Sequence, residues 1–264
     1  MTNFISNISN ILNHLKDWKW MYYQLTNNFL GILFKLSKNK GVYVVDKEWD
    51  NLIILDACSF ELFGEYIKKN KGLTGNLRKV VSRGSSTPEF LLENFGKGNF
   101  KDIVYISSNP FIKKILKKPF YDEVSLWLDL WDDDKKTVLP EDVVKKSMQV
   151  IKTYKNKKFI IHFMQPHCPF IGSYSLVGNF WRIALTHGCS KVMKAYESNL
   201  AYVMPYVIKL CKNLSGKTVI TADHGNACGE KAFGIFPIYG HPTGVHIDKL
   251  VEVPWFVFDD YIEY

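Results

Sequence analysis

The chain contains no apolar run long enough to cross a membrane. Runs such as residues 29–34 end at a lysine, whereas a spanning helix needs roughly 20 apolar residues. The amino terminus also lacks the basic start, apolar middle and small-residue cleavage pattern of a secretory signal. These two absences predict a protein that does not span a membrane. The expected location is the cytoplasm, with at most a peripheral contact at the inner face of the membrane.

Cysteine is scarce, and its spacing shows no pattern. The five cysteines stand at positions 58, 168, 189, 211 and 228, without CxxC pairs and without a recognisable disulfide framework. Reduced thiols are therefore expected, in keeping with a cytoplasmic location. Cys58 is expected to be a buried thiol rather than a ligand or nucleophile, because cysteine usually behaves as a small hydrophobe.

The composition is that of a globular protein with a positive charge. Of 264 residues, 47% are hydrophobic and 23% are charged, which excludes a disordered tail, a small disulfide knot or a fibre. A formal charge of +8 favours an anionic partner, such as a small anionic ester or anionic lipid. Nucleic acid is the weaker choice, because the lysines are scattered and no recognition motif is present.

The first 45 residues form a basic, amphipathic segment, distinct from a catalytic domain predicted over residues 46–264. One helical stripe consists of Phe4, Ile5, Ile8, Ile11, Leu12, Leu15 and Trp18. A second helix is predicted over residues 20–36. The favoured interpretation is a helical pair packed against its own domain. The alternative is peripheral contact with anionic lipid or a partner through residues 1–40, because the segment also carries Lys16, Lys19, Lys35, Lys38 and Lys40.

From Asn51 onward, short apolar runs alternate with helical stretches. This pattern is typical of an α/β fold with a doubly wound, mostly parallel sheet and helices on both faces. Strands are predicted at residues 52–55, 79–82, 103–107, 158–163, 218–221 and 251–258. Helices are predicted near residues 59–69, 88–96, 141–155 and 191–213. Ligands of such sheets bind beyond the carboxyl ends of the strands.

Candidate metal ligands follow two of these strands. Asp56 ends the run Leu-Ile-Ile-Leu, and Asp223 and His224 follow the run Thr-Val-Ile-Thr-Ala. Aspartate oxygens and a neutral histidine nitrogen suit a divalent ion such as Zn²⁺, Mn²⁺ or Mg²⁺. A lone aspartate in such a place is more often a helix cap. The Asp-His-Gly sequence after an apolar strand is harder to explain in that way.

A candidate nucleophile lies in the turn at residues 82–90. Pro88 suits a first helical position, which makes Thr87 the expected helix cap. A hydroxyl at a helix amino terminus is placed where backbone N–H groups favour negative charge, so it can attack an anionic ester. Ser86 and Arg83 stand in the same turn.

Together these residues resemble the alkaline phosphatase superfamily, in particular its sulfatase-like branch. The likeness covers residues 51–258 and includes two further segments, His-Cys-Pro-Phe at residues 167–170 and Tyr-Gly-His-Pro at residues 239–242. Asp56, the hydroxyl-bearing helix start and Asp-His-Gly stand in the order of that family.

The resemblance implies one divalent ion held by Asp56, Asp223 and His224. It implies Thr87 or Ser86 as both attacking group and ligand, and a covalent enzyme intermediate that is hydrolysed or passed to an acceptor. The choice of hydroxyl stays open, because the family often places its nucleophile two residues before a proline, whereas the cap argument favours Thr87. Substrate-binding roles are implied for Arg83, His167, His241 and, with a second metal site as the alternative, His246.

No Cys-x-Pro-x-Arg string is present, so a formylglycine sulfatase of the usual type is disfavoured. Hydrolysis of phosphate esters, or of sulfate esters, with a Thr or Ser nucleophile is the leading prediction. Two alternatives remain: a transferase that moves a phosphorylated group onto a glycan or lipid, and a catalytically silent member that binds an anion. His162 is either a hydrogen-bonded core residue or a further ligand.

Overall fold

The computed structural model describes residues 18–36, 39–70 and 72–259, with a seven-stranded sheet in the order β2-β11-β8-β1-β7-β3-β4. β1 pairs in parallel with β7 and β8, and β3 pairs in parallel with β7 and β4. β11 is antiparallel to β2 and β8. The strands are β1 (Asn51–Leu55), β2 (Gly75–Val81), β3 (Phe100–Ser107), β4 (Phe120–Ser125), β7 (Lys158–Phe163), β8 (Thr218–Thr221) and β11 (Glu252–Phe258). The predicted mostly parallel sheet is confirmed.

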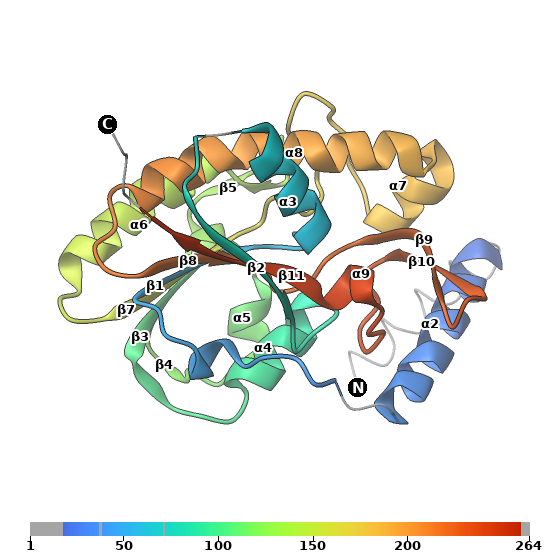
Figure 1. Cartoon of the computed structure of the whole chain (residues 1–264), viewed down its shortest axis with the longest axis horizontal. Helices are drawn as coiled ribbons and strands as arrows, with labels where there is room; N and C mark the ends of the chain where they lie inside the picture. Colours follow the sequence, from blue (N-terminus) through green and yellow to red (C-terminus); the bar gives the residue numbers. More distant parts are fainter. Residues whose placement is uncertain (1–17, 37–38, 71, 260–264) are drawn as a thin grey trace.

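Helices cover both faces of this sheet (Figure 1). Successive side chains of a strand point to opposite faces, so β1 contributes to two cores. Ile53 and Leu55 pack with α3 (Phe60–Lys69), α6 (Pro140–Thr153) and α8 (Cys189–Cys211). Leu52 and Ile54 pack with α4 (Thr87–Phe95) and α5 (Phe111–Ile115). Every residue of β1 is therefore buried, as in parallel sheets that are covered on both sides.

Several elements have no counterpart among the sequence predictions. The edge strand β4 carries charged residues, and the hairpin strand β9 has the sequence Ala-Cys-Gly-Glu-Lys-Ala, so neither shows an apolar run. The unpredicted elements besides β4 are η1 (Val44–Asp46), α5 (Phe111–Ile115), η2 (Leu126–Leu128), β5 (Trp131–Asp132), β6 (Thr137–Val138), α7 (Phe180–His187), β9 (Ala227–Ala232), β10 (Phe236–Gly240) and α9 (Asp248–Val251).

The amino-terminal helix α2 (Trp18–Leu36) packs on the hairpin β9–β10 (Figure 1). Leu30 and Phe34 are buried in a small core with residues of the hairpin and of the loop after it. The hydroxyl of Tyr23 donates to the Tyr239 carbonyl at 3.0 Å. The predicted helix over residues 20–36 is confirmed, whereas the predicted stripe from Phe4 to Leu15 lies outside the described residues. Within the described ranges, no helix combines the length and apolar character that crossing a bilayer requires.

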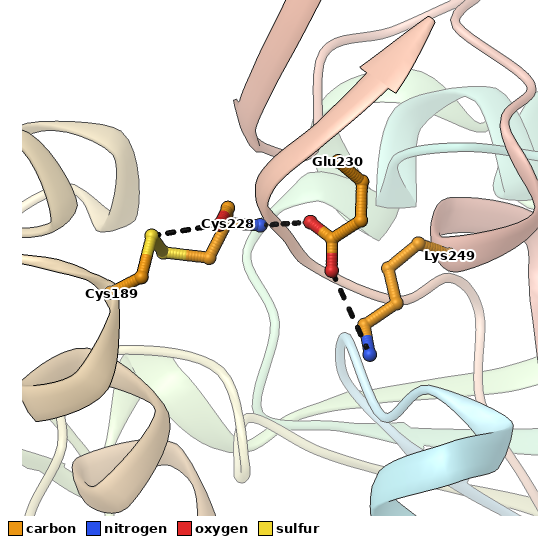
Figure 2. The surroundings of a disulfide bond; sticks show 4 residues. All are labelled: Cys189, Cys228, Glu230 and Lys249. Carbon is orange, nitrogen blue, oxygen red and sulfur yellow. Dashed lines mark hydrogen bonds and ion pairs between the residues drawn. A yellow bond between two sulfur atoms is a disulfide. The ribbon is translucent and has the colours of Figure 1, made fainter. Parts of the chain in front are cut away.

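A disulfide joins Cys189, at the start of α8, to Cys228 in β9 (Figure 2). The prediction of reduced thiols is wrong for this pair, because the hairpin brings together two cysteines that are 39 residues apart. Figure 2 also shows Glu230, which accepts from the Cys228 N–H and has a carboxylate oxygen 3.8 Å from the Lys249 ammonium. The hairpin is thus fastened to α8 and to the segment before β11. The remaining cysteines, Cys58, Cys168 and Cys211, are buried thiols outside the disulfide.

Candidate metal centre

Two neighbouring strands bring the predicted metal ligands together. β1 and β8 are parallel and adjacent, so Asp56 and the pair Asp223 and His224 leave the sheet at the same edge. One ligand atom from each of these three residues lies within 4.8 Å of the others, and all three side chains are buried. We call these three residues the metal cluster. Sequence positions 167 residues apart thus converge on one point.

The imidazole of His224 has the tautomer that a metal ligand needs. Its Nδ1 lies 2.8 Å from the Gly225 carbonyl oxygen, and because a carbonyl only accepts, Nδ1 carries the proton. The Nε2 atom therefore has a free lone pair, and it lies 3.6 Å from Asp56 Oδ1 and 3.5 Å from Asp223 Oδ2. A lone pair beside two carboxylate oxygens is repulsive unless a proton or a cation stands between them.

Each carboxylate of the metal cluster is held by backbone or amide donors through one oxygen, and the second oxygen faces the cluster. Asp223 Oδ1 accepts from the backbone N–H groups of Ala57 and His224, both at 2.9 Å. Asp56 Oδ2 accepts from the Asn109 side chain at 2.7 Å. Asp56 Oδ1 is buried and has no hydrogen-bond partner among the described residues. An orphaned buried carboxylate oxygen fits a bound cation, because such a group is otherwise costly to desolvate.

The electrostatics of the metal cluster also fit a cation. Burial raises the pKa of Asp56, and the neighbouring charge of Asp223 raises it further. Burial acts to raise the pKa of Asp223, but His224 and His162, together with the hydrogen bonds from Thr87 and the Ala57 N–H, hold that pKa below the ordinary value. Two buried carboxylates that lie close together repel each other when both are ionised. A divalent ion would neutralise them both, so the residues present fit such an ion.

The structure places Thr87, rather than Ser86, against the metal cluster. The Thr87 hydroxyl donates to Asp223 Oδ2 at 2.6 Å and lies 3.4 Å from His224 Nε2. The Ser86 hydroxyl instead pairs with that of Thr243 at 2.8 Å. The predicted helix cap is wrong by one residue, because Ser86 occupies the cap position of α4 and Thr87 is the first helical residue. The geometry therefore favours Thr87 as the nucleophile.

His167 and His241 lie next to the metal cluster. Their Nε2 atoms are 3.0 Å apart, and the ring of His241 lies 4.4 Å from that of His224. The backbone N–H of His167 donates to the Asp56 carbonyl, which fixes its loop to the end of β1. Both side chains are only partly buried, so a ligand at the metal cluster can reach them. Their substrate-binding roles stay predictions.

His162 faces the metal cluster from inside the sheet. Its Nδ1 contacts the Tyr105 hydroxyl at 3.0 Å, as expected for a hydrogen-bonded core histidine. Its buried Nε2 has no hydrogen-bond partner among the described residues and lies 3.9 Å from one oxygen of Asp56 and one of Asp223. His162 thus packs against both carboxylates from the side of the sheet.

Asn109 is a residue of the site that sequence reasoning missed. It contacts Asp56 and follows β3 at the same edge of the sheet.

The structure does not bring Arg83 to the metal cluster. Its guanidinium pairs with Glu93 at 2.7 Å, donates to the carbonyl groups of Asn39 and Gly41, and lies over the ring of Tyr43. These contacts fasten the segment after α2 to the turn that begins α4. A substrate-binding role for Arg83 has no support in this arrangement.

His246 belongs to a second group of polar residues beside the nucleophile turn. Its Nε2 lies 2.8 Å from Glu89 Oε1, and Glu89 Oε2 accepts from both the backbone N–H and the hydroxyl of Ser85, at 2.8 and 2.9 Å. The Gly244 N–H donates to the same hydroxyl at 2.9 Å. We call Ser85, Glu89, Gly244 and His246 the outer cluster. These hydrogen bonds hold the loop after β10 against α4, while His246 Nδ1 is buried without a partner among the described residues.

Comparisons with known proteins were made at the levels of sequence and structure. No protein-family model matches the chain. No curated protein matches it in sequence. Solved structures, in contrast, match over most of its length.

Integral membrane lipooligosaccharide phosphoethanolamine transferase A from Neisseria meningitidis is 12% identical with a TM-score of 0.55, over 98% of this chain and 61% of its own. The periplasmic domain of phosphoethanolamine transferase EptC from Campylobacter jejuni is 16% identical with a TM-score of 0.53, over 80% and 78%. A putative sulfatase from Bacteroides thetaiotaomicron is 14% identical with a TM-score of 0.50, over 78% and 63%.

At these identities the likeness concerns the fold, and it agrees with the resemblance carried by the sequence motifs. The seven-stranded sheet carries the metal cluster at its edge. The Thr87 hydroxyl, at the start of α4, lies next to that cluster. The chain therefore shares the fold of these three proteins, two of them named phosphoethanolamine transferases and one a putative sulfatase, and this fold agrees with the predicted alkaline phosphatase-like core.

Proposed function

We propose that the chain is a metal-dependent transferase that moves a phosphorylated group from an anionic ester to an acceptor on a glycan or lipid. The observation that carries the proposal is the position of the Thr87 hydroxyl, 2.6 Å from Asp223 Oδ2 and 3.4 Å from His224 Nε2. An alcohol becomes a useful nucleophile only when its proton is accepted or its pKa is lowered. Here the hydroxyl is buried against the groups that would do both.

The residues of the metal cluster would hold one divalent ion, with Thr87 beside it. When bound, such an ion supplies positive charge that lowers the pKa of an alcohol and stabilises a phosphoryl group. Thr87 begins α4, so the backbone N–H groups of the first helical turn face the same space and favour an anionic ester there.

In the proposed reaction, Thr87 Oγ1 passes its proton to Asp223 Oδ2 and forms a bond to phosphorus, while the bond from phosphorus to the leaving alcohol breaks. The pair of His167 and His241 gives that alcohol a proton. In the second half, the same histidine pair takes a proton from an acceptor hydroxyl or amine, which attacks the phosphorus. The bond to Thr87 Oγ1 then breaks, and the threonine regains its proton from Asp223.

Transfer is preferred to hydrolysis because of the names of the solved proteins that share the fold. Two of the three solved structures reported above are named phosphoethanolamine transferases, and the third is named a putative sulfatase. Hydrolysis of a phosphate or sulfate ester shares the first half-reaction and differs only in taking water as the acceptor. It is therefore the second candidate, supported by the same contact between Thr87 and the metal cluster.

The test is turnover of a chromogenic phosphodiester by protein loaded with Mn²⁺ or Zn²⁺, with and without a soluble amino alcohol as acceptor. A transferase gives a phosphorylated acceptor and a phosphorylated Thr87 peptide by mass spectrometry. A hydrolase releases the same phosphate with or without acceptor. Protein that binds metal but neither turns over nor becomes modified would contradict the proposal.

Thr87→Ala and Ser86→Ala form a matched pair for this assay. We expect Thr87→Ala to lower kcat by at least ~100-fold, because an activated nucleophile is removed. Ser86→Ala removes only the contact with Thr243, so we expect a change within about threefold. The reverse order of effects would assign the nucleophile to Ser86.

A further inference from the structure

Helix α2 is apolar on the face that turns away from the protein. Tyr22, Leu25, Phe29 and Ile32 are 50–70% exposed, and their spacing of three and four residues places them along one side of the helix. The opposite side holds the buried residue Leu30. A helix that only packed on its own domain would present polar side chains on its outer face.

The hairpin β9–β10 extends this apolar surface. Phe233 and Ile235, in the turn between the two strands, are 58% and 69% exposed. The Phe233 ring stacks on that of Phe34 in α2, with centroids 4.9 Å apart. Figure 1 shows the hairpin and α2 side by side at one end of the molecule. We call the four exposed side chains of α2, together with Phe233 and Ile235, the apolar face.

Charge indicates what covers the apolar face. The sequence of α2 contains Lys19 and Lys35 and no acidic residue, and it is rich in Trp, Tyr and Phe. Lys231 is exposed in the adjacent strand β9, and the whole chain carries +8. A positively charged helix with an aromatic and aliphatic face is typical of peptides that lie in the interface of an anionic bilayer.

We propose that the apolar face docks on an anionic lipid surface. The face is also coupled to the nucleophile turn. A side chain at Gly31 would meet the Thr243 carbonyl, so the backbone of α2 lies close to that loop, and the Thr243 hydroxyl pairs with that of Ser86 at 2.8 Å. Docking would therefore hold the part of the protein that carries the nucleophile turn near the headgroups. If the proposed function is right, an ester or acceptor that belongs to a lipid is within reach there.

The experiment is sedimentation of the full chain with vesicles of phosphatidylcholine alone, or mixed with phosphatidylglycerol. We expect binding to the anionic vesicles that weakens as salt is added. Leu25→Asp combined with Ile32→Asp is expected to reduce that binding by at least about tenfold. Leu92→Asp combined with Leu128→Asp is the matched control, because these leucines are 54% and 52% exposed at other places on the protein.

Two further measurements keep the test decisive if a variant folds poorly. A polarity-sensitive dye on Leu25→Cys is expected to shift to the blue with anionic vesicles, whereas the same dye on Leu128→Cys is not. Labelling is selective because the native thiols outside the disulfide are buried. Turnover of a soluble phosphodiester by the variant with aspartates at positions 25 and 32 is expected to stay within about twofold of wild type, so failure of docking and failure of the proposed function are distinguishable.

Equal sedimentation of wild type and the variant with aspartates at positions 25 and 32 would overturn the proposal. The proposal would also be overturned if the wild type were a dimer that does not bind vesicles and if the same variant were monomeric. A second copy of the chain would then cover the apolar face. Absence of vesicle binding by the intact monomer would also overturn it.

Discussion

The metal cluster and the outer cluster lie on either side of the same helix start, but they are built differently. In the metal cluster, Asp56 Oδ1 and His224 Nε2 are left free to face a common point. In the outer cluster, Glu89 uses both carboxylate oxygens on His246, Ser85 and Gly244, and His246 Nδ1 is the side-chain atom that has no partner among the described residues. A free carboxylate oxygen that faces a histidine nitrogen indicates a metal site, whereas carboxylate oxygens that are already occupied by hydrogen bonds indicate a structural contact. The two clusters therefore have separable effects on metal binding and on stability.

The largest expected effect is loss of the metal in Asp223→Ala. Removing a residue next to a metal ligand typically costs 10–100-fold in affinity, so removal of a ligand itself is expected to cost more than ~100-fold. Metal content after dialysis, measured by mass spectrometry, is the readout. Asp129→Asn is the control, because Asp129 is exposed. Equal metal content in Asp223→Ala and wild type would remove the distinction between the two clusters.

A smaller and different effect is expected for Glu89→Gln. Gln keeps the size of Glu but loses the charge that faces His246 and one of the acceptor oxygens, so we expect a loss of ~1–3 kcal/mol in the free energy of unfolding. Metal affinity should stay within about twofold, while turnover falls by about tenfold because the nucleophile turn is less firmly held. Denaturant titration and metal titration measure the two quantities separately. A Glu89→Gln protein that loses its metal would make the outer cluster part of the metal centre.

The smallest expected effect on catalysis belongs to Arg83→Gln. The guanidinium contacts Glu93, Tyr43 and two backbone carbonyl groups, so the substitution should lower stability by ~1–2 kcal/mol. The KM for an anionic ester should change by less than about threefold, because no contact of Arg83 lies at the metal cluster. A KM that rises more than about tenfold at unchanged stability would restore Arg83 to the substrate site.

The parts that sequence predicted well are those fixed by the sheet. The runs before Asp56 and Asp223 are apolar and buried, and two adjacent parallel strands leave their ligands at one edge. The alternation of apolar runs with helical stretches therefore predicts both the fold and the position of the metal cluster. Thr87 was predicted for its place in a helix cap, and the structure instead supports it as the first helical residue in contact with Asp223.

The parts that sequence could not predict depend on contacts between loops. Glu89 and His246 are 157 residues apart and follow no periodic pattern, so nothing local marks them as partners. The hairpin strand β9 lacks an apolar run, and its absence from the predicted elements also hid the pairing of Cys189 with Cys228. The positive charge of Arg83 suits an anionic substrate, but its guanidinium instead pairs with Glu93 and lies over the ring of Tyr43.

The disulfide has a consequence for how the two ends of the molecule are joined. Cys228 stands four residues after His224, in the hairpin on which α2 is seated, and the bond from Cys189 ties that hairpin to the long helix α8. Opening the bond with dithiothreitol should therefore remove one of several links between the hairpin and the rest of the protein. The ion pair of Glu230 with Lys249 and the small core around Leu30 and Phe34 should still hold the hairpin and α2 in place, so the cross-link acts mainly by restricting how far the hairpin can move from α8.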